Sequence, residues 1–161
     1  WHGANWTFIF WGLINALYFL DMARIKLPLP QRIDYETNLS LRVYDLNYGN
    51  HMGNDNVLSL VHEARIRFLH SLGLNEKDFY GNGLLMADSA VVYKKEAFYG
   101  EILNIRISVS EFHSYGFDLI YLITSQKNSI EIARVKTGLV CYDYIKKTLV
   151  KLPNKFRLNF D

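Results

Sequence analysis

The alternation of apolar and polar residues predicts five strands along this chain. The first strand begins near Thr37 and carries Leu39, Leu41 and Val43 on one face. Four longer apolar or alternating stretches follow after Gly83, and short turns rich in Gly, Ser and Asn separate them. They span residues 83–97, 101–112, 117–125 and 130–144. Because these strands are consecutive and joined by short turns, we expect an antiparallel sheet.

One stretch before these strands, residues 56–72, has the spacing of a helix instead. Its apolar stripe consists of Val57, Val61, Ala64, Phe68 and Leu72. Gly73 is placed to end the helix, since glycine readily adopts the left-handed conformation of a helix terminus. Leu60 and Ile66 fall off the stripe, which indicates that the helix is covered on more than one side.

This order of elements predicts an α+β fold in which an antiparallel sheet of about five strands wraps around one long central helix. The chain of 161 residues is long enough for one domain with an appendage, but too short for two full domains. We assign residues 37–161 to the domain and residues 26–36, which hold two of the three prolines, to a linker. Residues 1–25 form an apolar N-terminal segment.

Charge and cysteine content exclude several classes of function. The 18 basic and 16 acidic residues are scattered along the chain and give a net charge of only +2, so nucleic acid is not an expected partner. Cys141 is the single cysteine, which rules out an internal disulfide and a thiolate-rich metal site. We expect Cys141 to be a buried strand residue and the protein to be cytoplasmic.

The N-terminal segment contains fifteen consecutive uncharged residues, 6–20, which is short of the roughly 20 that cross a bilayer. Residues 1–20, "WHGANWTFIFWGLINALYFL", resemble a fragment of the membrane-bound O-acyltransferase family, in which the histidine of "WHG" is associated with acyl transfer. His2 would be that histidine. The segment is interpreted as a remnant, a fusion junction or an anchor, and membrane association through it stays an open alternative.

The loop before the helix, "NYGNHMGNDN" at residues 47–56, packs four asparagines, two glycines and one histidine into ten residues. Such residues suit turns and helix starts, so one interpretation is a capping loop. The other interpretation is a reaction site, because a glycine-containing turn before a helix aims free N–H groups at whatever lies in front of them.

Three motifs in the right order resemble the hot-dog-fold thioesterases related to 4-hydroxybenzoyl-CoA thioesterase, over about residues 39–144. They are "YDLNYGNHMGND" in the loop, "HEARIRFL" on the helix and "VVYKKEAFYGEIL" on the strands. The resemblance implies a hot-dog fold, a homodimer or dimer of dimers with shared sites, and hydrolysis of acyl thioesters of coenzyme A or an acyl carrier protein. It implies no metal, and coenzyme A would be part of the substrate rather than a cofactor.

The candidate catalytic residues are Asn47, His51, Asp45 and Glu63. The resemblance places Asn47 where the family often has a catalytic aspartate, and an amide cannot act as a base. We expect Asn47 to hold water or form the turn, His51 to act as acid or base or to fix the loop, and Asp45 to activate water or cap the strand end. Glu63 would either supply a carboxylate or pair with an arginine one turn along the helix.

The candidate substrate-binding groups are the backbone N–H groups near Gly53 and Asn54, which would stabilise negative charge on the carbonyl oxygen of the thioester. Asp88 interrupts an apolar strand, so we expect a buried acid that faces the dimer interface or the acyl channel. The favoured function is acyl-thioester hydrolysis. The alternatives are a non-hydrolytic module that binds acyl chains or acyl carrier protein, a membrane-tethered structural dimer, and a hydratase or dehydratase of the same fold.

Overall fold

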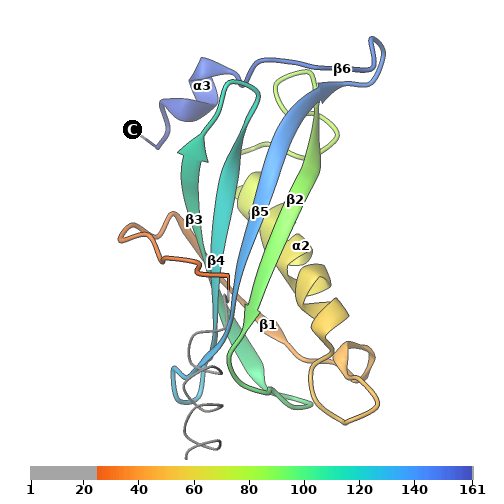
Figure 1. The fold of residues 1–161 in the computed structure, drawn as a ribbon, viewed down its shortest axis with the longest axis vertical. Coiled ribbons are helices and arrows are strands. Elements are labelled where there is room, and N and C mark those ends of the chain that lie inside the picture. The colour runs from red at the N-terminus through yellow and green to blue at the C-terminus, as the bar shows by residue number, and fades with distance from the viewer. Residues whose placement is uncertain (1–24, 161) are drawn as a thin grey trace, which may run out of the picture.

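The computed structural model describes residues 25–160 and contains one sheet with a long helix across one face (Figure 1). In chain order the elements are β1 (Tyr35–Ser40), the short 3-10 helix η1 (Val43–Asp45), α2 (Asn54–Ser71), β2 (Gly83–Tyr93), β3 (Ile102–Phe112), β4 (Gly116–Ser125), β5 (Glu131–Asp143), β6 (Thr148–Leu149) and α3 (Asn154–Arg157). The sheet is antiparallel in the order β1-β3-β4-β5-β2, and β6 adds to β5. The predicted hot-dog architecture is therefore confirmed.

The core lies between α2 and the concave face of the sheet. Val57, Val61 and Ala64 of the predicted helical stripe are completely buried, and Phe68 is nearly so. They pack with the inward residues of the three central strands, of which Tyr121 is the largest fully buried side chain. The apolar period of about 3.6 residues thus correctly predicted which side of the helix faces the sheet.

The ends of two predicted elements are wrong. β1 begins at Tyr35 and stops at Ser40, so Val43 lies in η1 with 67% of its surface exposed. The chain turns here because the carboxylate of Asp45 accepts the backbone N–H of Arg42 at 2.7 Å, which closes the turn before the strand can continue. Leu72, expected in the buried stripe, is 37% exposed because the helix ends at this residue and Gly73 takes the left-handed conformation.

Residues 27–36, expected to lie mainly in a linker, run along the sheet and hydrogen-bond to it. The carbonyl of Leu27 accepts Arg134 Nη1 at 3.0 Å, and the carboxylate of Asp34 accepts the N–H of Val109 at 2.7 Å. The predicted division into domains remains a prediction, and the interpretation of residues 1–20, with His2, falls outside the described residues. Between residues 25 and 160, no helix has the length and apolar character needed to cross a membrane.

Asp88 is not buried within the chain's own core, since 61% of its side chain is exposed in the single chain, and its expected place at a dimer interface stays a prediction. Asp88 lies in β2, which forms one edge of the sheet, and a register shift interrupts the β2–β5 pairing between Met86 and Asp88. Its carboxylate lies 3.4 Å from Lys136 Nζ on the neighbouring strand. An apolar run in the sequence indicates a strand but does not distinguish a central strand from an edge strand, so it could not predict this exposure.

Candidate active site

The loop between η1 and α2 is held in shape by short backbone pairings rather than by a long strand. Asn47 N–H donates to the carbonyl of His51 at 2.8 Å, which closes a tight turn around Asn50 with its positive φ of 61°. Met52 N–H donates to the carbonyl of Ala97 at 2.8 Å and ties the loop to the segment after β2. The loop therefore lies at one end of the sheet with a fixed backbone.

Asn47 and His51 meet inside this turn. Asn47 Oδ1 accepts the N–H of Gly49 at 2.8 Å, so its Nδ2 faces the imidazole, 3.3 Å from His51 Nδ1. His51 Nδ1 also lies 3.3 Å from the carbonyl oxygen of Met52. Gly49 allows this arrangement, since a Cβ at that position would lie 3.0 Å from His51 Nε2. The ring is one-third exposed and is positioned by groups of its own loop.

The start of α2 follows directly and supplies hydrogen-bond donors. Gly53 N–H is already used, because it donates to the carbonyl of Asp45 at 2.9 Å. Within residues 25–160, the N–H groups of Asn54 and Asp55 have no acceptor, as expected for the first turn of a helix. Tyr93 Oη donates to the carbonyl of Asn54 at 2.9 Å and so braces this turn. Of the two predicted donors, only Asn54 is free.

Asp45 is buried at the base of the loop, and both oxygens of its carboxylate accept hydrogen bonds. Its carboxylate accepts Arg42 Nε and Nη2, each at 3.2 Å, in addition to the backbone N–H of Arg42. Burial opposes ionisation of Asp45, but the hydrogen bonds and charge of Arg42 outweigh it and lower the pKa of this carboxyl below its ordinary value. The geometry supports the capping role among the two that we considered.

Glu63 does not lie beside Asn47 and His51 within one chain. It is nine residues beyond the helix start, which corresponds to about 13 Å along the axis at 1.5 Å per residue. Its Oε1 accepts Arg67 Nε at 2.8 Å, the ion pair considered as its alternative role. Both side chains line a groove of about 510 Å³ between α2 and β1, together with Arg42.

Glu96 and Tyr93 are the residues at this end of the molecule that sequence reasoning missed. Glu96 Oε1 lies 3.8 Å from His51 Nε2, and 64% of the glutamate side chain is exposed. Pairing between distant segments brings His51 and Glu96 together, because His51 forms an isolated β-bridge with Phe98. No local spacing could have indicated it.

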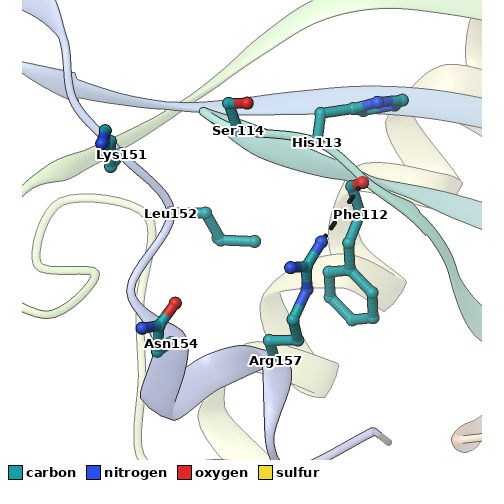
Figure 2. A pocket seen from close by; sticks show the side chains of 7 residues that line it. All are labelled: Phe112, His113, Ser114, Lys151, Leu152, Asn154 and Arg157. Carbon is teal, nitrogen blue, oxygen red and sulfur yellow. Dashed lines mark hydrogen bonds between the residues drawn. The ribbon is translucent and has the colours of Figure 1, made fainter.

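A second polar cluster and a cavity lie away from this loop. Glu111, His113 and Asp118 bring one ligand atom each within 4.8 Å of one another, but Lys136 Nζ already lies 2.9 Å from Asp118 and supplies a cation. The neighbouring cavity of about 530 Å³ is lined by Phe112, His113, Ser114, Lys151, Leu152, Asn154 and Arg157 (Figure 2). Figure 1 shows α3, which borders it, at the opposite end of the molecule from the loop. The cavity contains none of the predicted site residues.

Cys141 is fully buried in β5, which confirms its predicted placement. Desolvation raises the pKa of its thiol to about 11. A thiol in this state is a poor nucleophile at neutral pH.

Comparisons with known proteins agree with this architecture. A 1,4-dihydroxy-2-naphthoyl-CoA thioesterase from Synechocystis superposes with a TM-score of 0.72 at 17% identity, over 78% of this chain and 94% of that one. A DHNA-CoA thioesterase from Staphylococcus aureus gives 0.68 at 21% identity, over 76% and 83%. A further Staphylococcus aureus protein, solved in complex with CoA, gives 0.70 at 13% identity, over 83% and 84%.

At these identities the structural likeness shows the shared fold. The search of curated proteins found no significant match to the sequence. Family membership rests on a separate comparison. Residues 41–160, which include the loop, α2 and all of the sheet except β1, match a known protein family. The chain belongs to the Thioesterase-like superfamily.

Proposed function

We propose that the protein hydrolyses an acyl thioester to a free acid and a thiol at the loop between η1 and α2. The observation that carries this proposal is the position of the Asn47–His51 pair directly before a helix start with free N–H groups. Thioester hydrolysis needs a positioned water and donors that stabilise the developing oxyanion. Membership of the Thioesterase-like superfamily supports the same reaction.

The N–H groups of Asn54 and Asp55 are the proposed oxyanion donors. They lie in the first turn of α2, where the helix dipole adds positive potential. Gly53 supports them from the N-cap position rather than donating, since its own N–H is bonded to Asp45. Loss of one oxyanion donor typically costs about 2.7–4 kcal/mol in the reaction barrier, so correct placement of this turn matters for the rate.

Asn47 and His51 are the proposed positioning groups on the other side of the reacting carbonyl. Asn47 fixes the imidazole through the contact between its Nδ2 and His51 Nδ1. We assign Asp45 to the loop's structure because Arg42 occupies its carboxylate, and we assign Glu63 to its ion pair with Arg67 in the groove. Neither assignment requires a bound metal.

The proposed substrate is an acyl thioester of coenzyme A, with an acyl-carrier-protein thioester as the alternative. The named thioesterases with this fold act on CoA thioesters, and one neighbour was solved with CoA. Coenzyme A would enter as part of the substrate.

The proposed assembly is a homodimer through β2. This strand is eleven residues long and lies at the edge of the sheet, and the side chains from Met86 to Ser89 are exposed. An open edge of this length has unpaired backbone groups that a second copy can satisfy by antiparallel pairing. A two-fold axis there would join two sheets edge to edge and bring a partner chain close to each site.

The direct test is thiol release by the purified full chain from short, medium and long aliphatic acyl-CoAs and from aromatic acyl-CoAs. Saturable turnover with at least one substrate is expected. Tight binding of acyl-CoA without thiol release would instead support the non-hydrolytic acyl-binding module.

A further inference from the structure

The proposed hydrolytic site needs a group that takes a proton from water, and neither Asn47 nor the buried Asp45 can do so. The amide of Asn47 has no basic lone pair at neutral pH, and the carboxylate of Asp45 is occupied by three donors of Arg42. Glu101, on the adjacent turn, is also engaged, since its Oε1 accepts the N–H of Phe98 at 3.0 Å. The groups left at this end of the molecule are the imidazole of His51 and the carboxylates of Glu96 and Asp55.

We propose that Glu96 is the catalytic carboxylate of this site and that His51 orients it. This inference rests on the proposed function. Glu96 Oε1 lies 3.8 Å from His51 Nε2, and within residues 25–160 the Glu96 carboxylate has no hydrogen-bond donor of its own. At 64% exposure it is open to water and to a substrate thioester.

The backbone on both sides of Glu96 is anchored, which distinguishes it from an ordinary surface glutamate. Lys95 N–H donates to the carbonyl of Ile132 at 3.2 Å, and the carbonyl of Ala97 accepts Met52 N–H at 2.8 Å. Ala97 is completely buried. Its bond to Met52 links the Glu96 segment to the loop that carries His51, so the backbone segments that carry the two side chains are held close together.

The contacts of the His51 ring define its role. His51 Nδ1 lies 3.3 Å from Asn47 Nδ2 and 3.3 Å from the carbonyl oxygen of Met52, and Nε2 is the ring nitrogen that faces Glu96. With a proton on Nε2, the imidazole would face one carboxylate oxygen of Glu96 at 3.8 Å, beyond hydrogen-bond distance, and a small movement of either side chain would bring the two into contact. Asn47 is then a positioning residue, since it contacts the imidazole that lies beside Glu96.

The reaction balances with these groups. Glu96 takes a proton from water while the water oxygen bonds to the thioester carbon, and the carbonyl electron pair moves to oxygen opposite the N–H groups of Asn54 and Asp55. When the carbonyl reforms, the C–S bond breaks and the thiolate takes the proton from Glu96. The products are one carboxylic acid and one thiol from one thioester and one water.

Asp55 is the competing carboxylate, since it lies in the first turn of α2. Its charge there is explained by the helix dipole, which favours an acid at this end. A carboxylate beside the oxyanion donors would also oppose the negative charge that develops on the carbonyl oxygen. Glu96 lies outside the helix and beside the imidazole of His51, so the helix dipole does not account for its position.

The test uses the full chain with Glu96→Gln, Glu96→Asp and Glu96→Ala, and with Glu111→Gln as an exposed control at the far end of β3. Glu96→Gln should lower kcat by about 10²-fold or more and change KM little. Glu96→Asp should keep part of the rate, and added formate should restore turnover to Glu96→Ala but not to Glu96→Gln. Melting temperatures should stay at the wild-type value, because the side chain is exposed.

Two results would overturn the proposal in different ways. If the wild type turns over acyl-CoA and Glu96→Gln stays within two-fold of it, the Glu96 assignment is wrong while the hydrolase function stands, and a loss in Asp55→Asn would then identify Asp55. If the wild type releases no thiol from any acyl-CoA or acyl-carrier-protein thioester, both the function and the assignment fail.

Discussion

Arg42 donates its backbone N–H and two guanidinium hydrogens to the carboxylate of Asp45, and this contact ends β1 and starts the loop of the candidate site. One residue pair thus sets the direction in which the loop leaves the sheet. It also occupies the carboxylate of the "YDLN" stretch with three donors.

Replacement of Asp45 by Asn should therefore lower stability more than activity. The loss of a buried, charge-assisted cap is expected to cost about 1–2 kcal/mol, or several degrees in melting temperature, while activity per folded molecule stays within a few-fold. Thermal unfolding and thiol release on the same preparations would check this. A stable variant with a 10²-fold loss of turnover would return Asp45 to the list of catalytic residues.

The same pair predicts how stability depends on pH. Because the pKa of Asp45 is lowered in the folded state, its contribution is present above the unfolded value of about 3.9 and is lost as the pH falls through the lower folded pKa. The difference in melting temperature between wild type and Asp45→Asn should be constant near neutrality and shrink below about pH 4. A difference that grows on acidification would contradict the role of Arg42.

Gly116 should not tolerate a side chain. A Cβ at this position would lie 1.8 Å from the carbonyl oxygen of Leu139 on the neighbouring strand, and backbone cannot move aside without breaking the β4–β5 pairing. Gly116→Ala is expected to destabilise the fold by about 1–3 kcal/mol or more. Ser114→Ala, an exposed change in the same turn, is the control, and equal melting temperatures for both variants would show that the close approach is not required.

Cys141 should be inert to thiol reagents in the folded protein. Its burial and its raised pKa of about 11 keep the thiol neutral and inaccessible at pH 8. Titration with a chromogenic disulfide should find no reactive thiol in the native state and one after denaturation. An unreactive Cys141 would also mean that the protein's own thiol adds no signal to thiol-release assays. Fast labelling of the native protein would contradict the prediction and place Cys141 near the surface.

Most of the fold could be predicted from the sequence because apolar periodicity reports burial directly. The stripe from Val57 to Phe68 and the apolar positions Leu103, Ile105 and Ile107 of β3 depend only on which side chains face the core. The exposure of Asp88 in the single chain could not be predicted in this way, because the order of strands in the sheet makes β2 an edge strand. The contact between His51 and Glu96 was invisible for a similar reason, since pairing between distant segments creates it.

Removal of residues 1–20 should leave a dimeric domain with its thioester chemistry. The described fold begins after this segment, and β2 provides the proposed dimer edge. Light scattering on the truncated chain should give twice the monomer mass, and turnover should match the full chain. A folded, active monomer would exclude a shared site, while a loss of turnover in a folded dimer would give the N-terminal segment a part in the reaction.

The most direct measurement for the loop is the turnover number of Asn47→Ala and His51→Ala in thiol release from the best acyl-CoA, corrected for folded fraction. If the loop is the reaction site, each variant should lose about 10²-fold or more in kcat while its melting temperature falls by only a few degrees. If both variants keep wild-type turnover per folded molecule and only their melting temperatures fall, the loop is a helix cap and the proposed active site is wrong.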